Sequence, residues 1–182
     1  RKIINISLAD GLSGTYQTAC TAREMAKNRD DITVLNTKTL CGPHRYLVEC
    51  AAAMAKEGKG ETEILQMLNE NMQHTKSFLI PQDFEYLRRG GRLSPTAAFV
   101  GSLLDIKPIL VLNESGTSLD KFGMARTMKG AAKSVFKQLK KENVGKGDIL
   151  YIVHGAVAKT ANQIKEMALE EFPGIDVRVH LL

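Results

Sequence analysis

Short apolar runs rich in β-branched residues alternate along this chain with longer stretches whose apolar residues recur every three or four positions. The short runs predict strands and the longer stretches predict helices. We expect strands at residues 3–8, 31–36, 76–81, 107–113, 148–155 and 176–182. Helices are expected at 44–58, 61–75, 127–142 and 158–172, and one more after Ser13. This alternation predicts an α/β protein with a mostly parallel sheet and crossover helices.

The middle of the chain departs from the alternation. Asp83 is placed to cap a short helix that stops at Gly90, and Ser94 is placed to cap a second one. The apolar side of that second helix would consist of Ala97, Ala98, Val100, Leu103 and Leu104. Residues 107–113 and 117–122 flank a Glu-Ser-Gly turn and predict a hairpin. We therefore expect two lobes, approximately 1–75 and 76–182, the second containing helices and a β-hairpin.

The segment LSGTYQTA, residues 12–19, lies where the first strand gives way to a helix. Ser13 is predicted as the N-cap of this helix, Thr15 falls in its first turn, and Gly14 would let a ligand approach the backbone. Helix N-termini hold anions, and strand ends in open α/β sheets face ligands. The segment therefore predicts a small binding site for a carboxylate or a phosphate. The alternative is a serine that only caps the helix.

Two groups of basic residues allow more than one interpretation. Arg88, Arg89 and Arg92 surround a Gly-Gly pair, where they would either bind an anion or partner, or face the negative end of a helix dipole. The second, structural interpretation is slightly favoured. Arg126 stands with several lysines at a helix start, where basic residues are disfavoured. It is interpreted either as a partner contact or as part of a solvated basic face.

Several classes of function find little support in the sequence. The net charge is +5, but the basic residues are scattered and tryptophan is absent, which argues against nucleic-acid binding. No apolar run approaches the roughly 20 residues needed to cross a bilayer. The histidines and cysteines lack metal-ligand spacing, so free thiols in a cytoplasmic protein and a structural His154 are expected. No nucleophile motif or acid pair stands out, which favours binding over catalysis.

Taken together and in order, five segments of the chain resemble the DegV family of bacterial proteins. LSGTYQTA is similar to the family motif LSGTYQSA, and FEYLRRGGRLS is similar to its Gly-Gly-Arg-Ile/Leu-Ser motif. GSLLDIKPIL and ARTMKGA resemble the Ile-Lys-Pro segment and the Arg-Thr helix start of the family. IVHG resembles the strand before its last crossover helix. The resemblance covers essentially the whole chain.

The resemblance implies a two-lobed carrier that buries one long-chain fatty acid in an apolar tunnel and performs no chemistry itself. It implies that Ser13, with Gly14 and Thr15, binds the fatty-acid carboxylate. It further implies a cytoplasmic protein that presents the acid to a separate fatty-acid kinase, which forms an acyl phosphate for phospholipid synthesis. Arg126 matches the Arg-Thr motif and is the residue expected to dock the kinase. No cofactor, metal, nucleic acid or stable membrane insertion is implied.

The sequence also departs from the family pattern. Ala9-Asp10 stands where the family has Ser-Ser, and Asp10 would repel an ionised acid unless it points away. The family's Thr-Ser-Gln-Pro and His-Thr-Gly-Pro-Gly segments are missing, so we expect the chain to lack terminal segments at both ends. A related fold occurs in dihydroxyacetone-kinase-like phosphotransferases, and this enzyme class is the alternative function. A regulatory DNA-binding module would need a helix-turn-helix or basic stripe, which the sequence does not show.

Overall fold

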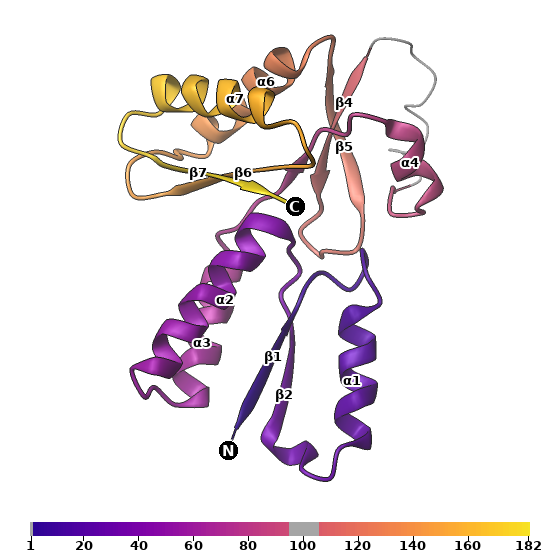
Figure 1. Cartoon of the computed structure of the whole chain (residues 1–182), viewed down its shortest axis with the longest axis vertical. Coiled ribbons are helices and arrows are strands. Elements are labelled where there is room, and N and C mark those ends of the chain that lie inside the picture. The colour runs from indigo at the N-terminus through magenta and orange to yellow at the C-terminus, as the bar shows by residue number, and fades with distance from the viewer. Residues whose placement is uncertain (1, 95–105) are drawn as a thin grey trace. The chain divides into compact units, whose positions relative to one another are not determined.

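The fold is described from a computed structural model, which describes residues 2–94 and 106–182. The first part of the chain forms β1 (Ile3–Ser7), α1 (Thr15–Met25), the short 3-10 helix η1 (Arg29–Asp31), β2 (Ile32–Asn36), α2 (Cys41–Lys56) and α3 (Glu61–Met72). There follow β3 (Phe78–Leu79), α4 (Phe84–Arg89), β4 (Lys107–Leu112), β5 (Leu119–Ala125), α6 (Met128–Lys141), β6 (Ile149–His154), α7 (Ala158–Glu171) and β7 (Asp176–Leu181). Figure 1 labels these elements except η1 and β3. The helix predicted after Ser94 lies outside the described residues.

Contacts between residues divide the chain into two compact units. The first unit comprises Arg1–Ser77 together with Leu112–Leu119, and the second comprises Phe78–Val111 and Asp120–Leu182. The first unit is therefore discontinuous in sequence, because it takes in the turn between β4 and β5. The expected lobes at 1–75 and 76–182 stay a prediction.

The first unit is built on a parallel pair of strands. β1 and β2 pair in register from Ile3 opposite Ile32 to Ser7 opposite Asn36. Side chains alternate across a strand, so Ile4 and Ile6 share one face of β1 and pack against the core of α2 and α3. That core consists of Leu47, Ala51, Ile64 and Leu68. In Figure 1, α1 lies on the other side of the strand pair.

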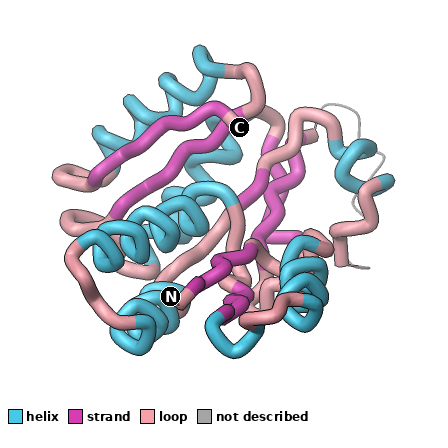
Figure 2. Tube along the Cα trace, turned by 60° about the horizontal axis from the view of Figure 1, so that its bottom comes forward, coloured by secondary structure: helices cyan, strands magenta, loops and turns pink. Residues whose placement is uncertain are grey.

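The second unit contains another parallel pair, β6 and β7, which run side by side toward the C-terminus in Figure 2. α6 presents an apolar face to the core and α7 packs beside it. The rings of Phe136 and Phe172 meet edge to face there, with their centroids 5.5 Å apart. Such contacts add to the burial of the two aromatic side chains.

A third sheet has the strand order β3, β4, β5. β3 runs antiparallel to β4, with Phe78 opposite Val111. The predicted α/β class is confirmed, and the two parallel pairs agree with the expected sheet. The antiparallel pairing of β3 was not predicted.

A carboxylate accepts a backbone amide bond at the start of both α4 and α3. Asp83 caps α4 as predicted, because its carboxylate accepts a hydrogen bond from the Glu85 amide at 2.8 Å. α3 begins after Gly60, whose N–H donates to the Glu63 carboxylate at 3.0 Å. A glutamate that reaches back in this way satisfies one of the helix's unpaired amides.

Candidate functional site

The loops that follow β1 and β2 are joined at the carboxyl ends of these strands. The Thr37 amide and hydroxyl both donate to the Ser7 carbonyl, each at 2.9 Å. The Ala9 amide donates to the Thr39 carbonyl, also at 2.9 Å. Ser7, Ala9, Thr37 and Thr39 are all buried. The polar groups at this sheet edge are thus largely used to hold the two loops together.

The turn between β4 and β5 packs closely on both loops. A Cβ placed on Gly11 would lie 2.2 Å from the Cα of Thr117, and one on Gly116 would lie 2.8 Å from the Cα of Lys38. Gly116 has a φ of 73° and Lys38 a φ of 52°, both in the left-handed region. Backbone approach this close leaves no room for a side chain at either glycine. Three chain segments therefore meet at the predicted site edge.

The start of α1 differs from the prediction for Ser13. The N-cap is Gly14, and Ser13 precedes it. The Leu12 and Ser13 amides both donate to the Ala9 carbonyl, at 3.1 and 3.2 Å, so the turn includes Ser13 and delays the helix by one residue. The Ser13 hydroxyl instead lies 2.8 Å from the Thr15 hydroxyl and accepts from the Thr15 amide at 3.3 Å. Two hydroxyl groups consequently stand together at the helix start.

Gly14 has no structural need to be glycine. Its φ is −69°, which every residue type adopts, and a Cβ built on it would meet nothing within 4 Å. The first helical bond runs from the Thr18 amide to the Gly14 carbonyl at 2.9 Å, so the amides of residues 15–17 precede the hydrogen-bonded ladder, and that of Thr15 donates to the Ser13 hydroxyl. Open space beside these amides and two hydroxyls is an arrangement that can receive a carboxylate.

The charges near this helix start are mixed. The pKa of the Tyr16 phenol is raised, first by its hydrogen bond and charge interaction with Cys20, then by burial and by the Asp10 carboxylate. The negative charge of Asp10 therefore reaches the first turn of α1, where it opposes an anionic ligand. The helix dipole, whose positive end lies at this helix start, instead favours an anionic ligand.

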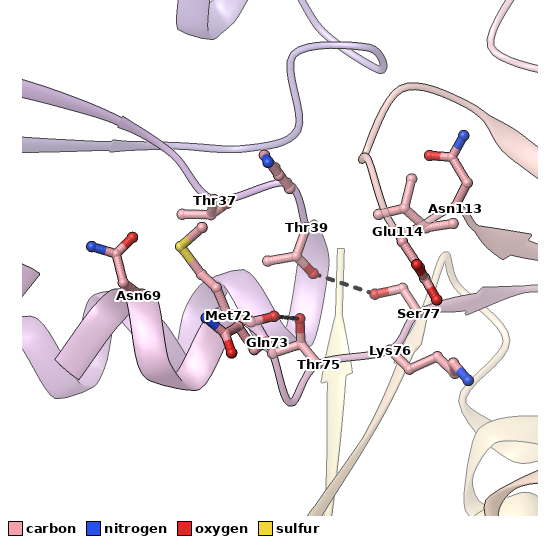
Figure 3. A pocket seen from close by; sticks show the side chains of 12 residues that line it. Thr37, Thr39, Asn69, Met72, Gln73, Thr75, Lys76, Ser77, Asn113 and Glu114 are labelled. Atoms are coloured by element: carbon pink, nitrogen blue, oxygen red, sulfur yellow. Dashed lines mark hydrogen bonds between the residues drawn. The ribbon is translucent and has the colours of Figure 1, made fainter. Parts of the chain in front are cut away.

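A separate pocket of about 440 Å³ lies in the first unit (Figure 3). It is bounded by the loop Thr37–Thr39, the end of α3, residues 75–77 and the turn after β4. Ten of its twelve lining side chains are polar or charged, and only Met72 and Leu112 are apolar. Neither Ser13, Gly14 nor Thr15 lines it. Its polar side chains can bind a polar group, and its lining also includes apolar surface.

A histidine that the sequence did not single out supports this pocket. The Thr37 hydroxyl donates to Ser7, so it accepts from Nδ1–H of His44, 3.2 Å away. Burial lowers the pKa of His44 and favours its neutral form. The only sequence signal for this contact is the position of His44 shortly after the end of β2.

The predicted basic residues lie in the second unit. Arg126 is exposed between β5 and Thr127, the N-cap of α6. The Arg88 guanidinium donates to the Glu85 carboxylate at 2.8 Å, Arg89 lies 3.9 Å from it, and Arg92 donates to the Gly90 carbonyl. Only the Arg92 contact is at the carboxyl end of α4, where the structural interpretation placed these arginines, because Glu85 lies in the first turn of the helix.

Other expected site features were also located. His154 ends β6 and is partly buried. Within residues 2–94 and 106–182, no three His, Cys, Asp or Glu side chains gather as a metal site would require. None of the described helices has the length and apolar character needed to span a membrane.

Comparison with known proteins agrees with the fold and the motifs. The family model described as "Uncharacterised protein, DegV family" matches residues 1–182. A DegV domain-containing protein of Clostridium perfringens is 35% identical over 181 residues, which cover 97% of this chain and 62% of that protein. The chain thus spans less than two thirds of the length of this relative.

Solved structures give the same result. A DegV family protein from Eubacterium eligens, loaded with heptadecanoic acid, superposes with a TM-score of 0.86 and 25% identity, covering all of this chain and 66% of that one. The fatty acid kinase (Fak) B3 protein of Streptococcus pneumoniae, loaded with linoleic acid, shares the fold at a TM-score of 0.84 and 22% identity. The match covers 99% of this chain and 64% of the pneumococcal protein. With its full-length family match, its motifs and its fold, the chain belongs to the DegV family.

Proposed function

We propose that this protein binds one long-chain fatty acid, with the carboxylate at the start of α1 and contacts from Ser13, Gly14 and Thr15. The observation that carries the proposal is Gly14, which neither backbone conformation nor packing within the described chain requires. A ligand that approaches the helix amides gives the glycine a role. The Ser13 and Thr15 hydroxyls bond each other at 2.8 Å, and the hydroxyl that accepts in this bond keeps its own hydrogen to donate to a carboxylate.

The acyl tail would occupy an apolar tunnel. Burying about 14–16 methylenes at about 0.8 kcal/mol each contributes on the order of 10 kcal/mol. The tail is not assigned to the pocket beside Thr37, because most of the side chains that line it are polar or charged. The heptadecanoic acid carried by the Eubacterium relative supports an acid of this class as the ligand.

The protein would act as a cytoplasmic carrier rather than as an enzyme, and would present its fatty acid to a separate kinase. This step is supported by the Arg-Thr motif at Arg126 and by the name of the pneumococcal protein with the same fold. Arg126 is exposed, as a docking residue must be. No cofactor is assigned, since the fatty acid itself is the ligand.

Native mass spectrometry of the complete protein, followed by solvent extraction, tests the ligand. A stoichiometric long-chain acid is expected, and a protein that is empty and takes up neither oleate nor palmitate would contradict the proposal. Ser13→Ala should weaken oleate binding, because one carboxylate donor is lost. Thr21→Ala is the matched control, since it removes a hydroxyl from the same helix that bonds only the Gln17 carbonyl, at 3.0 Å.

Arg126→Ala tests the kinase step separately. The variant should bind oleate as the unmodified protein does, but support slower acyl-phosphate formation by the kinase. Arg89→Ala, which removes another exposed arginine of the same unit, should change neither measurement. A loss of oleate binding in Arg126→Ala would place Arg126 in the pocket or the fold instead.

A further inference from the structure

The exposed face of α6 is uniformly basic. Lys129, Lys133 and Lys137 recur at intervals of four residues, and all three are exposed. They form one stripe about 12 Å long, given a rise of about 1.5 Å per residue. We call these three residues the α6 lysine stripe. The helix contains no acidic residue from Met128 to Lys141.

Two other helices pair charges of opposite sign along their surfaces, whereas α3 carries three glutamates and no basic residue. Arg45 and Glu49 pair on α2 at 2.6 Å, and Arg88 pairs with Glu85 on α4 at 2.8 Å. On α6, Lys140 alone has an ion pair among the contacts described, with Glu171 at 2.6 Å. Like charges four residues apart on a helix repel one another, and Lys129 in the first turn also opposes the helix dipole. The stripe is thus a positively charged surface that a negatively charged partner would complement.

The stripe continues into the region already assigned to partner docking. Arg126 precedes Lys129 by three residues and is exposed. Met124, two residues before Arg126, leaves 44% of its surface exposed. Met and Arg are enriched in the cores of protein interfaces, whereas lysines belong to their rims. In the sequence, two exposed residues of the kind found in interface cores thus directly precede the lysine stripe.

We propose that the α6 lysine stripe docks an acidic surface of the fatty-acid kinase, with Met124 and Arg126 at the centre of the contact. The identity of this partner rests on the proposed function. A protein partner is favoured over an anionic membrane, because helices that bind membrane surfaces insert large apolar side chains. Among the described residues, none of the exposed large apolar side chains lies in α6. Complementary charges of this kind act mainly on the rate of association.

The test compares association of the complete protein with the purified, immobilised kinase of the same organism by biolayer interferometry. Lys133→Glu/Lys137→Glu should slow association about tenfold at low salt, and the difference should shrink at high salt. Lys133→Gln/Lys137→Gln should fall in between. Lys56→Glu/Lys159→Glu reverses two other exposed lysines and should associate like the unmodified protein.

Three results would overturn the inference. One is equal slowing in the stripe variant and in the Lys56/Lys159 control. Another is an unmodified protein that takes up oleate but does not bind the kinase. The third is stripe-dependent binding to phosphatidylglycerol vesicles without stripe-dependent binding to the kinase. Oleate uptake, measured by native mass spectrometry, should be the same in all variants. A protein that takes up no oleate would refute the proposed fatty-acid binding. The stripe would then be tested by the kinase measurement alone.

Discussion

Replacing Gly14 by alanine separates ligand binding from folding at the start of α1. The new methyl group would meet nothing within 4 Å, and the backbone at a φ of −69° accommodates alanine. The expected cost in unfolding free energy is therefore only that of a poorer N-cap, up to about 1 kcal/mol. In the bound protein, the same methyl group would stand beside the amides that receive the carboxylate.

The expected loss of affinity follows from one displaced donor. A hydrogen bond to a charged group contributes about 1.5–3 kcal/mol. Its loss corresponds to a dissociation constant for oleate that is roughly 10- to 150-fold higher. Isothermal titration with oleate measures the affinity, and urea unfolding of the same preparation measures the stability.

Gly60→Ala supplies the matched control for this experiment. Gly60 is also an N-cap glycine with an ordinary φ of −74°, and the nearest atom to its added Cβ would be a Glu63 carboxylate oxygen at 3.8 Å. It should cost similar stability and leave oleate binding unchanged. If Gly14→Ala folds and binds oleate as tightly as the unmodified protein, the carboxylate does not lie at the start of α1.

Further predictions concern the fold. Gly11→Ala brings a methyl group to 2.2 Å from the Thr117 Cα and should lower the unfolding free energy by about 1–3 kcal/mol or more, as measured in urea. Unchanged stability would refute the close packing of this turn. Phe136→Ala removes the edge-to-face partner of Phe172 and should cost about 3–5 kcal/mol, whereas a loss below about 1 kcal/mol would contradict its place in the core. Burial lowers the pKa of His44, so the unfolded chain takes up this proton at higher pH than the folded chain, and unfolding free energy should fall as the pH drops from about 7 to about 5. His44→Gln should show a smaller fall over this range, and an identical pH profile would exclude His44 as its source.

Local patterns predicted the elements whose signals are contained in a few residues. The apolar spacing of α6 and the alternation in β1 are such signals, as is the Asp83 cap. The cap of α1 was predicted one residue too early because both Ser13 and Gly14 are acceptable N-caps by sequence. The choice is made by the turn at Ala9, whose carbonyl accepts from the Ser13 amide.

Features that join distant residues could not be predicted. The antiparallel pairing of β3 with β4 depends on chain segments about 30 residues apart, and short strands do not specify their partners. The need for glycine at position 11 arises from Thr117, and the pocket forms where α3 meets the turn after β4. The carboxylate contacts assigned to Ser13 came from the family resemblance, since a serine before a helix is by itself a common cap.

The discontinuous first unit has a consequence for synthesis. Leu112–Leu119 belong to this unit, and their turn fills the space beside Gly11 and Lys38. During translation, β1, β2, α2 and α3 therefore leave the ribosome well before the residues that complete their packing are made. The backbone at Gly11 and Lys38 therefore stays uncovered in the nascent chain until Leu119 has emerged. Expression of residues 1–77 as a separate domain would make that incomplete state permanent.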